Sequence, residues 1–265
     1  MSFNDNWKIH LAHWLNGLGI DVFTLRRGLK GLPAVINEYR QFKYLSGLSN
    51  GFQTRFNYPC PADRYEEAGT ASGHYFHQDL LVARKIFERN PARHMDVGSR
   101  IDGFVAHVAS FRNIEVLDLR QITKTVENIT FHEFDLMSDA NQFDACCDSL
   151  SCLHTLEHIG LGRYGDQIMV DGYVKGFQRL WAILKPGGIL YLSVPIGPQR
   201  IEFNAHRVFA VHTILDMASD QFELLRFSFV DDIGDLHENV DLIQNTIGHS
   251  FNCWYGCGIF EFQKL

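Results

Sequence analysis

An α/β fold built around a mostly parallel sheet is predicted for residues 73–265, and three observations support it. Short apolar segments alternate with amphipathic helical segments along this part of the chain. A turn containing glycine and serine follows the first apolar segment. A Pro-Gly-Gly turn separates the strongest helical segment from the fifth apolar segment. Such alternation is typical of parallel sheets whose two faces are covered by helices.

Residues 1–72 precede this alternation and have a different character. Apolar residues recur at helical spacing through residues 1–50, which predicts two or three helices. Glycines and prolines then punctuate residues 51–73, which predicts an irregular connection. We therefore expect a helical N-terminal extension over 1–72 and an α/β domain over 73–265.

The elements of the α/β domain follow from its apolar runs and from the turns between them. The expected strands are His94–Val97, Ile114–Leu117, Thr130–Phe134, Ser149–Leu153, Ile189–Val194, Phe222–Val230 and Tyr255–Phe262. The expected helices are His77–Arg89, Gly103–Ser110, Tyr173–Leu184 and Val211–Ala218. Because ligands of such sheets bind beyond the C-terminal ends of the strands, the residues that follow each strand are the candidate site residues.

The first candidate motif is HMDVGSRIDGF, residues 94–104. A strand leads through Asp96 into Gly98 and Ser99, and Gly103 opens a helix. Glycine permits the positive φ angles and the close backbone approach that a ligand-cradling turn needs. The alternative is an ordinary turn in which Asp96 or Ser99 caps the helix.

Two acidic residues end the next two expected strands. Asp118 ends the strand in IEVLDLR, residues 114–120, and a carboxylate there can accept both hydroxyls of a ribose. Asp135 follows the third strand, where an acid can meet an adenine amino group. Taken alone, an aspartate at the position of Asp118 is more often a turn or capping residue, and Asp135 is equally consistent with a solvated aspartate.

Two further motifs, LHTLEHIGLGRYGD (153–166) and LKPGGILYLSVP (184–195), complete the pattern. Here the sequence resembles the class I S-adenosylmethionine-dependent methyltransferases, whose small-molecule members carry LEH after strand four and LKPGG before strand five. The resemblance implies a Rossmann-like fold with a mostly parallel seven-stranded sheet and an antiparallel last strand. The sequences of residues 94–104, 149–166 and 201–209 (IEFNAHRVF) also resemble a methyltransferase-like family catalogued only as a domain of unknown function.

The resemblance implies a role for each motif. The turn after strand one would face the methionine part of the cofactor S-adenosylmethionine, Asp118 would hold the ribose, Asp135 would approach the adenine, and His154 would lie near the methyl group. The implied cofactor-binding residues are Asp96, Gly98, Ser99, Gly103, Asp118 and Asp135.

The turn departs from the usual pattern of the family at two positions. Arg100 and Asp102 stand where the second and third glycines of D-x-G-x-G-x-G fall, and Gly103 is displaced by one. A bulky Arg100 reshapes or partly blocks the cleft in this reading. A nicotinamide site is disfavoured, because only two of the three glycines of G-x-G-x-x-G are present.

Histidine is the natural proton acceptor for methyl transfer to a hydroxyl near neutral pH. Of the 13 histidines, His154 and His206 are the candidate catalytic residues, because each follows an expected strand; His158 ranks below them. The alternative for each is a structural histidine bonded to the backbone. Arg200, Glu202, Asn204 and Arg207 would read a polar or anionic acceptor, or cap the next helix.

No metal is expected. The residues of the acidic loop that could bind a divalent cation are Asp231, Asp232, Asp235, His237 and Glu238, but such loops are common on surfaces. Cys253 and Cys257 lack a second ligand pair at zinc spacing.

Composition excludes other classes. The net charge of −7 and the absence of a Lys/Arg run argue against a nucleic-acid partner. No apolar stretch suits a transmembrane span, and the absence of a signal peptide together with the spacing of the six cysteines predicts a cytoplasmic location.

These observations predict methyl transfer to a small polar acceptor, such as a sugar or related metabolite. The alternatives are a non-catalytic methyltransferase-like protein used for binding or assembly, and an enzyme that binds another nucleotide, with a metal at residues 231–238. The N-terminal helices are expected to pack on the domain or to form a homo-oligomer.

Overall fold

The computed structural model describes residues 6–46, 53–243 and 248–265, so the ends of the helical stretch expected over 1–50 lie outside the described residues. The chain divides into two compact units, Met1–Thr70 and Ala71–Leu265. This boundary lies two residues from the one expected at 72/73. No helix among the described residues is long and apolar enough to cross a membrane.

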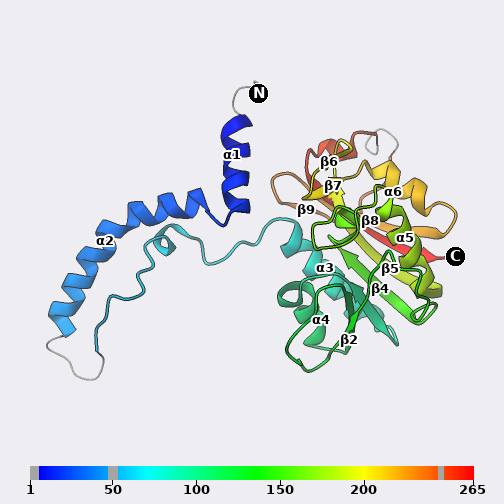
Figure 1. Cartoon of the computed structure of the whole chain (residues 1–265), viewed down its shortest axis with the longest axis horizontal. Coiled ribbons are helices and arrows are strands. Elements are labelled where there is room, and N and C mark those ends of the chain that lie inside the picture. The colour runs from blue at the N-terminus through cyan, green and yellow to red at the C-terminus, as the bar shows by residue number, and fades with distance from the viewer. Residues whose placement is uncertain (1–5, 47–52, 244–247) are drawn as a thin grey trace. The chain divides into compact units, whose positions relative to one another are not determined.

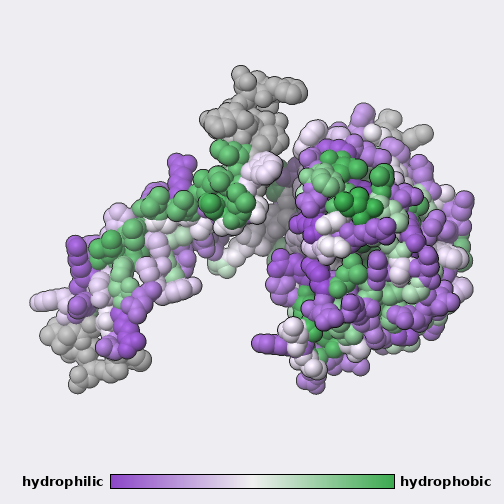
Figure 2. Space-filling model, viewed as in Figure 1, coloured by the Kyte–Doolittle hydropathy of each residue, from purple (hydrophilic) through white to green (hydrophobic). Residues whose placement is uncertain are grey.

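The first unit contains two α-helices, α1 (Asn6–Gly17) and α2 (Val22–Ser46), followed by the short 3-10 helix η1 (Asp63–Tyr65). Asp21 begins α2, because its Oδ1 accepts the backbone N–H groups of Phe23 and Thr24 at 2.9 and 3.0 Å. Large apolar side chains of α1 and α2 remain exposed, and they form the green surface along these helices in Figure 2. This unit therefore leaves much apolar surface uncovered within itself.

The second unit is built on a central sheet with helices on both faces (Figure 1). Within the described residues this sheet has eight strands in the order β3-β2-β1-β4-β5-β10-β8-β9. The strands are β1 (His94–Val97), β2 (Ile114–Asp118), β3 (Ile129–Glu133), β4 (Cys147–Leu153), β5 (Leu184–Ile196), β8 (Phe222–Val230), β9 (Leu236–His237) and β10 (Gly256–Lys264).

Strands β1 to β5 pair in parallel, whereas β10 is antiparallel to both β5 and β8. The predicted Rossmann-like class I methyltransferase fold, with its antiparallel last strand, is thus confirmed. Two features were not predicted: the two-residue strand β9 beside β8, and a hairpin of β6 (Arg200–Glu202) and β7 (His206–Val208), which we expected to be a loop.

Two apolar cores hold the layers together. One face packs against α5 (Gly172–Ile183) and α6 (Val211–Ala218), with Phe177 and Ile214 at most 2% exposed. The other face packs against α3 (His74–Arg89), the π-helical turn η2 (Ile101–Val105) and α4 (Ala106–Ala109). Buried residues of α3 recur at the 3.6-residue period of an amphipathic helix. Two 3-10 turns, η3 (Leu156–His158) and η4 (Ser250–Asn252), complete the unit.

Candidate functional site

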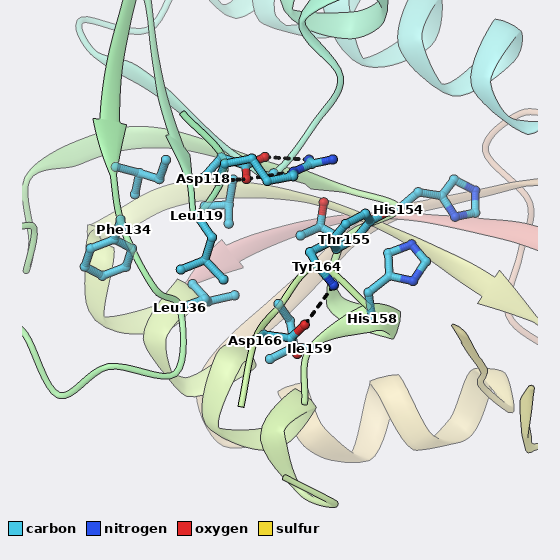
Figure 3. A pocket seen from close by; sticks show the side chains of 14 residues that line it. Asp118, Leu119, Phe134, Leu136, His154, Thr155, His158, Ile159, Tyr164 and Asp166 are labelled. Carbon is cyan, nitrogen blue, oxygen red and sulfur yellow. Dashed lines mark hydrogen bonds and ion pairs between the residues drawn. The ribbon is translucent and has the colours of Figure 1, made fainter. Parts of the chain in front are cut away.

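A pocket lies at the C-terminal ends of β1, β2, β3 and β4, where the strand order reverses between β1 and β4. This switch point is where open parallel sheets bind ligands. In Figure 3, Asp118 and Phe134 line one side of the pocket, and the imidazoles of His154 and His158 lie on the opposite side. The pocket therefore has an acidic and apolar half and a histidine-bearing half.

Gly98 sits in the turn after β1 and lines this pocket. Its φ is +74°, a conformation that residues with a Cβ rarely adopt, and a Cβ built there would lie 2.4 Å from Thr155 Cγ2. The Gly98 N–H donates to the carbonyl of Leu117 at 2.9 Å, which fixes the turn against β2. Only glycine lets β1 and the segment after β4 approach this closely.

Asp96 supports the turn from inside the sheet. Its carboxylate accepts the Ser99 N–H and hydroxyl at 3.0 and 2.8 Å and the Ser151 hydroxyl at 2.5 Å. The residue is fully buried, and burial raises the pKa of its carboxyl to about 6. All of these contacts are internal, so a direct contact between Asp96 and a cofactor stays a prediction, whereas Ser99 borders a second hollow beside the turn.

Asp118 lines the pocket at the end of β2, the position expected of a ribose-binding acid. Its carboxylate forms a two-bond ion pair with Arg120, with Nε–Oδ1 at 3.0 Å and Nη2–Oδ2 at 2.6 Å. The Arg120 guanidinium also lies 4.4 Å from the centre of the Tyr164 ring. Arg120 and Tyr164 were not predicted from the sequence; the position of Arg120, two residues after Asp118, was the available signal.

Arg100 does not fill the pocket. Its side chain is 68% exposed and pairs with Asp102 at 2.8 Å, so it forms the rim of the hollows on either side of the turn. Gly103 faces α3, because a Cβ there would lie 3.0 Å from Asp79 Oδ2. Because the Arg100 side chain points away from the pocket, it does not obstruct the cleft in the way that was expected.

The segment before β1 also reaches this turn. Tyr75 and Gln78 line the hollow beside Ser99 and Gly103, together with Asp79. His77 is not part of this lining, and its ring packs edge-on against Phe76.

Asp135, the expected adenine partner, accepts the Met137 N–H at 2.8 Å and is not among the residues that line the pocket. Its neighbours Phe134 and Leu136 do line it, and both are nearly buried. A flat apolar ring and a branched aliphatic chain are suited to contact the face of a purine. The alternation of the apolar residues Phe134 and Leu136 with Asp135 after β3 was the sequence pattern that indicated these two pocket residues, but they were not predicted from it.

His154 directly follows β4 and has a φ of +50°. Its Nδ1 lies 2.7 Å from Oε1 of the buried Glu157. Burial opposes protonation of the ring, but the Cys257 and Glu157 side chains outweigh burial and raise the pKa of His154 well above its ordinary value. His158 also lines the pocket, but its Nδ1 is 2.7 Å from the carbonyl oxygen of Ala205, which fits the structural alternative.

His206 begins β7 and does not line the pocket itself. Its ring packs 4.9 Å from that of Tyr255, which in turn lies 5.3 Å from the ring of His74. The His74 ring stacks on His154 at 5.2 Å. His206 and His154 therefore belong to one chain of packed rings. Burial lowers the pKa of His206, so its ring is neutral at neutral pH.

The arginines of the β6–β7 hairpin are used internally. Arg207 is buried and donates to the carbonyls of Glu157, Ile159 and Val170. Arg200 donates to the Glu202 carboxylate and to two backbone carbonyls. Both guanidiniums are thus engaged within the protein, and neither bonds to α6, the next helix, so these contacts support neither acceptor recognition nor the capping alternative.

The acidic loop before β10 is also held by its own contacts. Asp231 accepts the N–H groups of Ile233 and Asp235 at 3.0 Å and pairs with His237 at 2.8 Å. Asp232 accepts the N–H groups of Trp254 and Tyr255. These carboxylates shape the loop and are not gathered around a cation position.

Solved structures similar to this chain include 1,6-didemethyltoxoflavin-N1-methyltransferase of Burkholderia thailandensis, determined with 1,6-didemethyltoxoflavin and S-adenosylhomocysteine bound. It is 16% identical, covers 88% of each chain and has a TM-score of 0.49. The [4+2]-cyclase SpnF is 16% identical over 70% of this chain and 81% of its own, with a TM-score of 0.49. The N-methyltransferase NodS of Bradyrhizobium japonicum is 11% identical over 72% and 88%, with a TM-score of 0.47.

No curated protein matches the chain. A family model described as "Caenorhabditis protein of unknown function, DUF268" matches residues 104–247. That segment contains Asp118, His154 and His206, whereas His74, the Gly98 turn and Cys257 lie outside it. Because the match covers more than half of the 265 residues, the chain belongs to the DUF268 family.

Proposed function

We propose that this protein transfers a methyl group from S-adenosylmethionine to a small polar acceptor, such as a sugar or a related metabolite. The observation that carries the proposal is that Gly98, Asp118 and Phe134 line one pocket at the switch point of the sheet. A backbone cradle, a carboxylate and an aromatic ring in that order suit the amino-acid, ribose and adenine parts of an adenosyl ligand.

The residues present fit this ligand once Arg120 leaves Asp118. Gly98 lets the turn pack against Thr155 without a side chain of its own between them, and Arg100 points outward. Asp118 would then accept the ribose hydroxyls, and Phe134 and Leu136 would contact the adenine face. When bound, S-adenosylmethionine supplies an electrophilic methyl group on a sulfonium.

The histidine-bearing half of the pocket would receive the acceptor. His206 does not line the pocket itself but belongs to the chain of packed rings that reaches His154. It is neutral at neutral pH, which is the form that accepts a proton from a hydroxyl that reaches it. His154 is held close to Glu157 with a raised pKa and therefore would position or polarise the acceptor when it is protonated. Both roles are proposals that extend the sequence-based assignment of these two histidines.

Calorimetry with S-adenosylmethionine and S-adenosylhomocysteine tests the cofactor directly. We expect saturable binding of both ligands to the full chain. No binding of either ligand at millimolar concentration would contradict the proposal. A subsequent screen of sugars, polyols and amino compounds, read by mass spectrometry as the gain of one methylene, tests the acceptor class. Turnover confined to nucleic acid or protein acceptors would overturn it.

A second candidate function is non-catalytic binding or assembly, and two observations favour it. Arg120 occupies the Asp118 carboxylate, and α1 and α2 expose apolar side chains, among them Trp14 (76%) and Leu29 (65%). In this alternative the helices mediate self-association of the chain. Light scattering of the full chain would give a mass above that of one chain, and Leu29→Gln would lower it. The cytoplasmic location stays a prediction.

A further inference from the structure

Among residues 6–46, 53–243 and 248–265, one group of metal-ligating side chains converges from three separate elements. His74 begins α3, His154 follows β4, and Cys257 is the second residue of β10. One ligand atom from each of these side chains lies within 4.8 Å of the other two. His154 is 7% exposed and Cys257 is fully buried, so this is an interior arrangement.

One ring nitrogen of His154 has no partner. Its Nδ1 is engaged by Glu157 Oε1 at 2.7 Å, whereas Nε2 is buried and makes no hydrogen bond among the described residues. A buried polar atom left unpaired costs about 1–3 kcal/mol. The side chain is only 4% exposed, so bulk water is not an ordinary partner for this nitrogen.

The contact with Glu157 matches the outer shell of known metal sites. Histidine ligands commonly bond a carboxylate through the nitrogen that does not bind the metal, which fixes the ring and strengthens the other nitrogen as a donor. Glu157 is 1% exposed and is held in η3 immediately after His154. Nε2 is therefore the nitrogen of His154 that remains to act as a ligand, once a metal ion displaces the proton that the raised pKa keeps on the ring.

The other two side chains lie against His154. The His74 ring stacks on the His154 ring, with the ring centres 5.2 Å apart. Cys257 is a free cysteine whose thiol lies 3.7 Å from Gln78 Oε1. Loss of the thiol proton on metal binding would break this contact and the 4.0 Å contact of the thiol with the Gly258 carbonyl, both of which are long.

We propose that His74, His154 and Cys257 form a zinc site, with Glu157 as the carboxylate that orients His154. Two imidazoles and one thiolate are the borderline-soft donors that zinc prefers, whereas calcium and magnesium select oxygen. Zinc bonds of about 2.0 Å to nitrogen and about 2.3 Å to sulfur place ligand atoms roughly 3.3–3.7 Å apart, so the three side chains must close in slightly.

Three protein ligands leave one position of a tetrahedral zinc ion for water or for a substrate oxygen. His154 also lines the pocket described above, so the proposed site adjoins the acceptor half of that pocket. A zinc ion there would lower the pKa of a bound hydroxyl or water. This last role rests on the proposed function, whereas metal binding itself does not.

Cobalt titration of the chelator-treated full chain tests the site under reducing conditions without any adenosyl ligand. We expect one equivalent of Co²⁺ to give the visible bands of tetrahedral cobalt and a near-ultraviolet thiolate charge-transfer band. One equivalent of Zn²⁺ should then bleach both. The absence of these bands in the wild-type protein would overturn the proposal, whatever the result of the S-adenosylhomocysteine experiment.

Matched variants identify the ligands. Cys257→Ser should remove the charge-transfer band, whereas Cys253→Ser, at a second buried free cysteine, should leave it unchanged. Glu157→Gln should keep the tetrahedral spectrum and weaken cobalt affinity about 10- to 100-fold. Circular dichroism checks that each variant is folded. If Cys257→Ser does not fold, His74→Ala gives the same decision, because it should lose the visible bands of tetrahedral cobalt. A full thiolate band in folded Cys257→Ser, or an unchanged tetrahedral spectrum in folded His74→Ala, would refute the site.

Discussion

Replacing Asp118 by asparagine tests the assignment of the adenosyl half of the pocket. Asparagine keeps the shape of the side chain but removes the charge that would accept the ribose hydroxyls. Hydrogen bonds to charged groups contribute about 1.5–3 kcal/mol. In the wild-type protein, however, the ligand must first displace Arg120 from Asp118, and a partly exposed ion pair is worth about 0.2–1 kcal/mol. The net loss is then about 0.5–2.8 kcal/mol, or roughly a 2- to 110-fold weaker Kd.

Calorimetry with S-adenosylhomocysteine measures this change, and Arg120→Gln separates its two contributions. Freeing Asp118 should tighten binding by up to about fivefold, and this gain should vanish in the double variant because the pair no longer exists. Asp102→Asn is the control, because that carboxylate is 71% exposed and pairs only with Arg100 in the described residues. Unchanged affinity in Asp118→Asn, or weaker binding in Arg120→Gln, would refute this reasoning.

Three further predictions address the turn and the acceptor half. Gly98→Ala should abolish ligand binding and lower the free energy of unfolding, measured in urea, by at least about 1–2 kcal/mol, because Gly98 has a positive φ and a Cβ there would collide with Thr155. Gly165→Ala is the control, because Gly165 has a φ of +84° but open space around it, and this variant should keep full binding. Because the carboxyl pKa of Asp96 is raised to about 6, its protonated form stabilises the folded protein below about pH 4, and this stabilisation is lost as the pH rises through 6. The free energy of unfolding of the wild type should therefore fall by about 3 kcal/mol relative to Asp96→Asn over this window. A difference that does not depend on pH would contradict this prediction. His206→Asn should lower kcat about 100-fold or more without changing S-adenosylhomocysteine affinity, and an equal loss of both would mean a structural role.

Sequence patterns predicted the sheet well because its strands are continuous apolar runs that end in recognisable turns. The strand expected over 222–230 and the helix over 211–218 match β8 and α6 at both ends. The hairpin β6–β7 was missed because each of its strands has three residues and carries charged side chains. Such short elements are fixed by tertiary contacts, here by Arg207 and the carbonyls it bonds, and not by local periodicity.

The candidate site was predictable only in part. Single residues after strands could be placed, so Gly98, Asp118 and His154 were identified and line the pocket. Pairings between side chains could not be predicted, because spacing along the chain does not show which groups meet. The ion pair of Asp118 with Arg120 is therefore evident only in three dimensions, as is the meeting of His154 with Cys257, 103 positions further along the chain (257 − 154).

The position of β10 has a consequence for the order in which the domain can be completed. Strand β10 lies between β5 and β8, and β8 pairs in the main sheet only with β10 and β9 among the described residues. During synthesis, β8 therefore leaves the ribosome before the strand that joins it to the sheet. Until residues 256–264 emerge, the edge of β5 and the edge of β8 are both unpaired and open to incorrect pairing. Translation through these last strands is consequently the interval in which a chaperone would protect the nascent chain most.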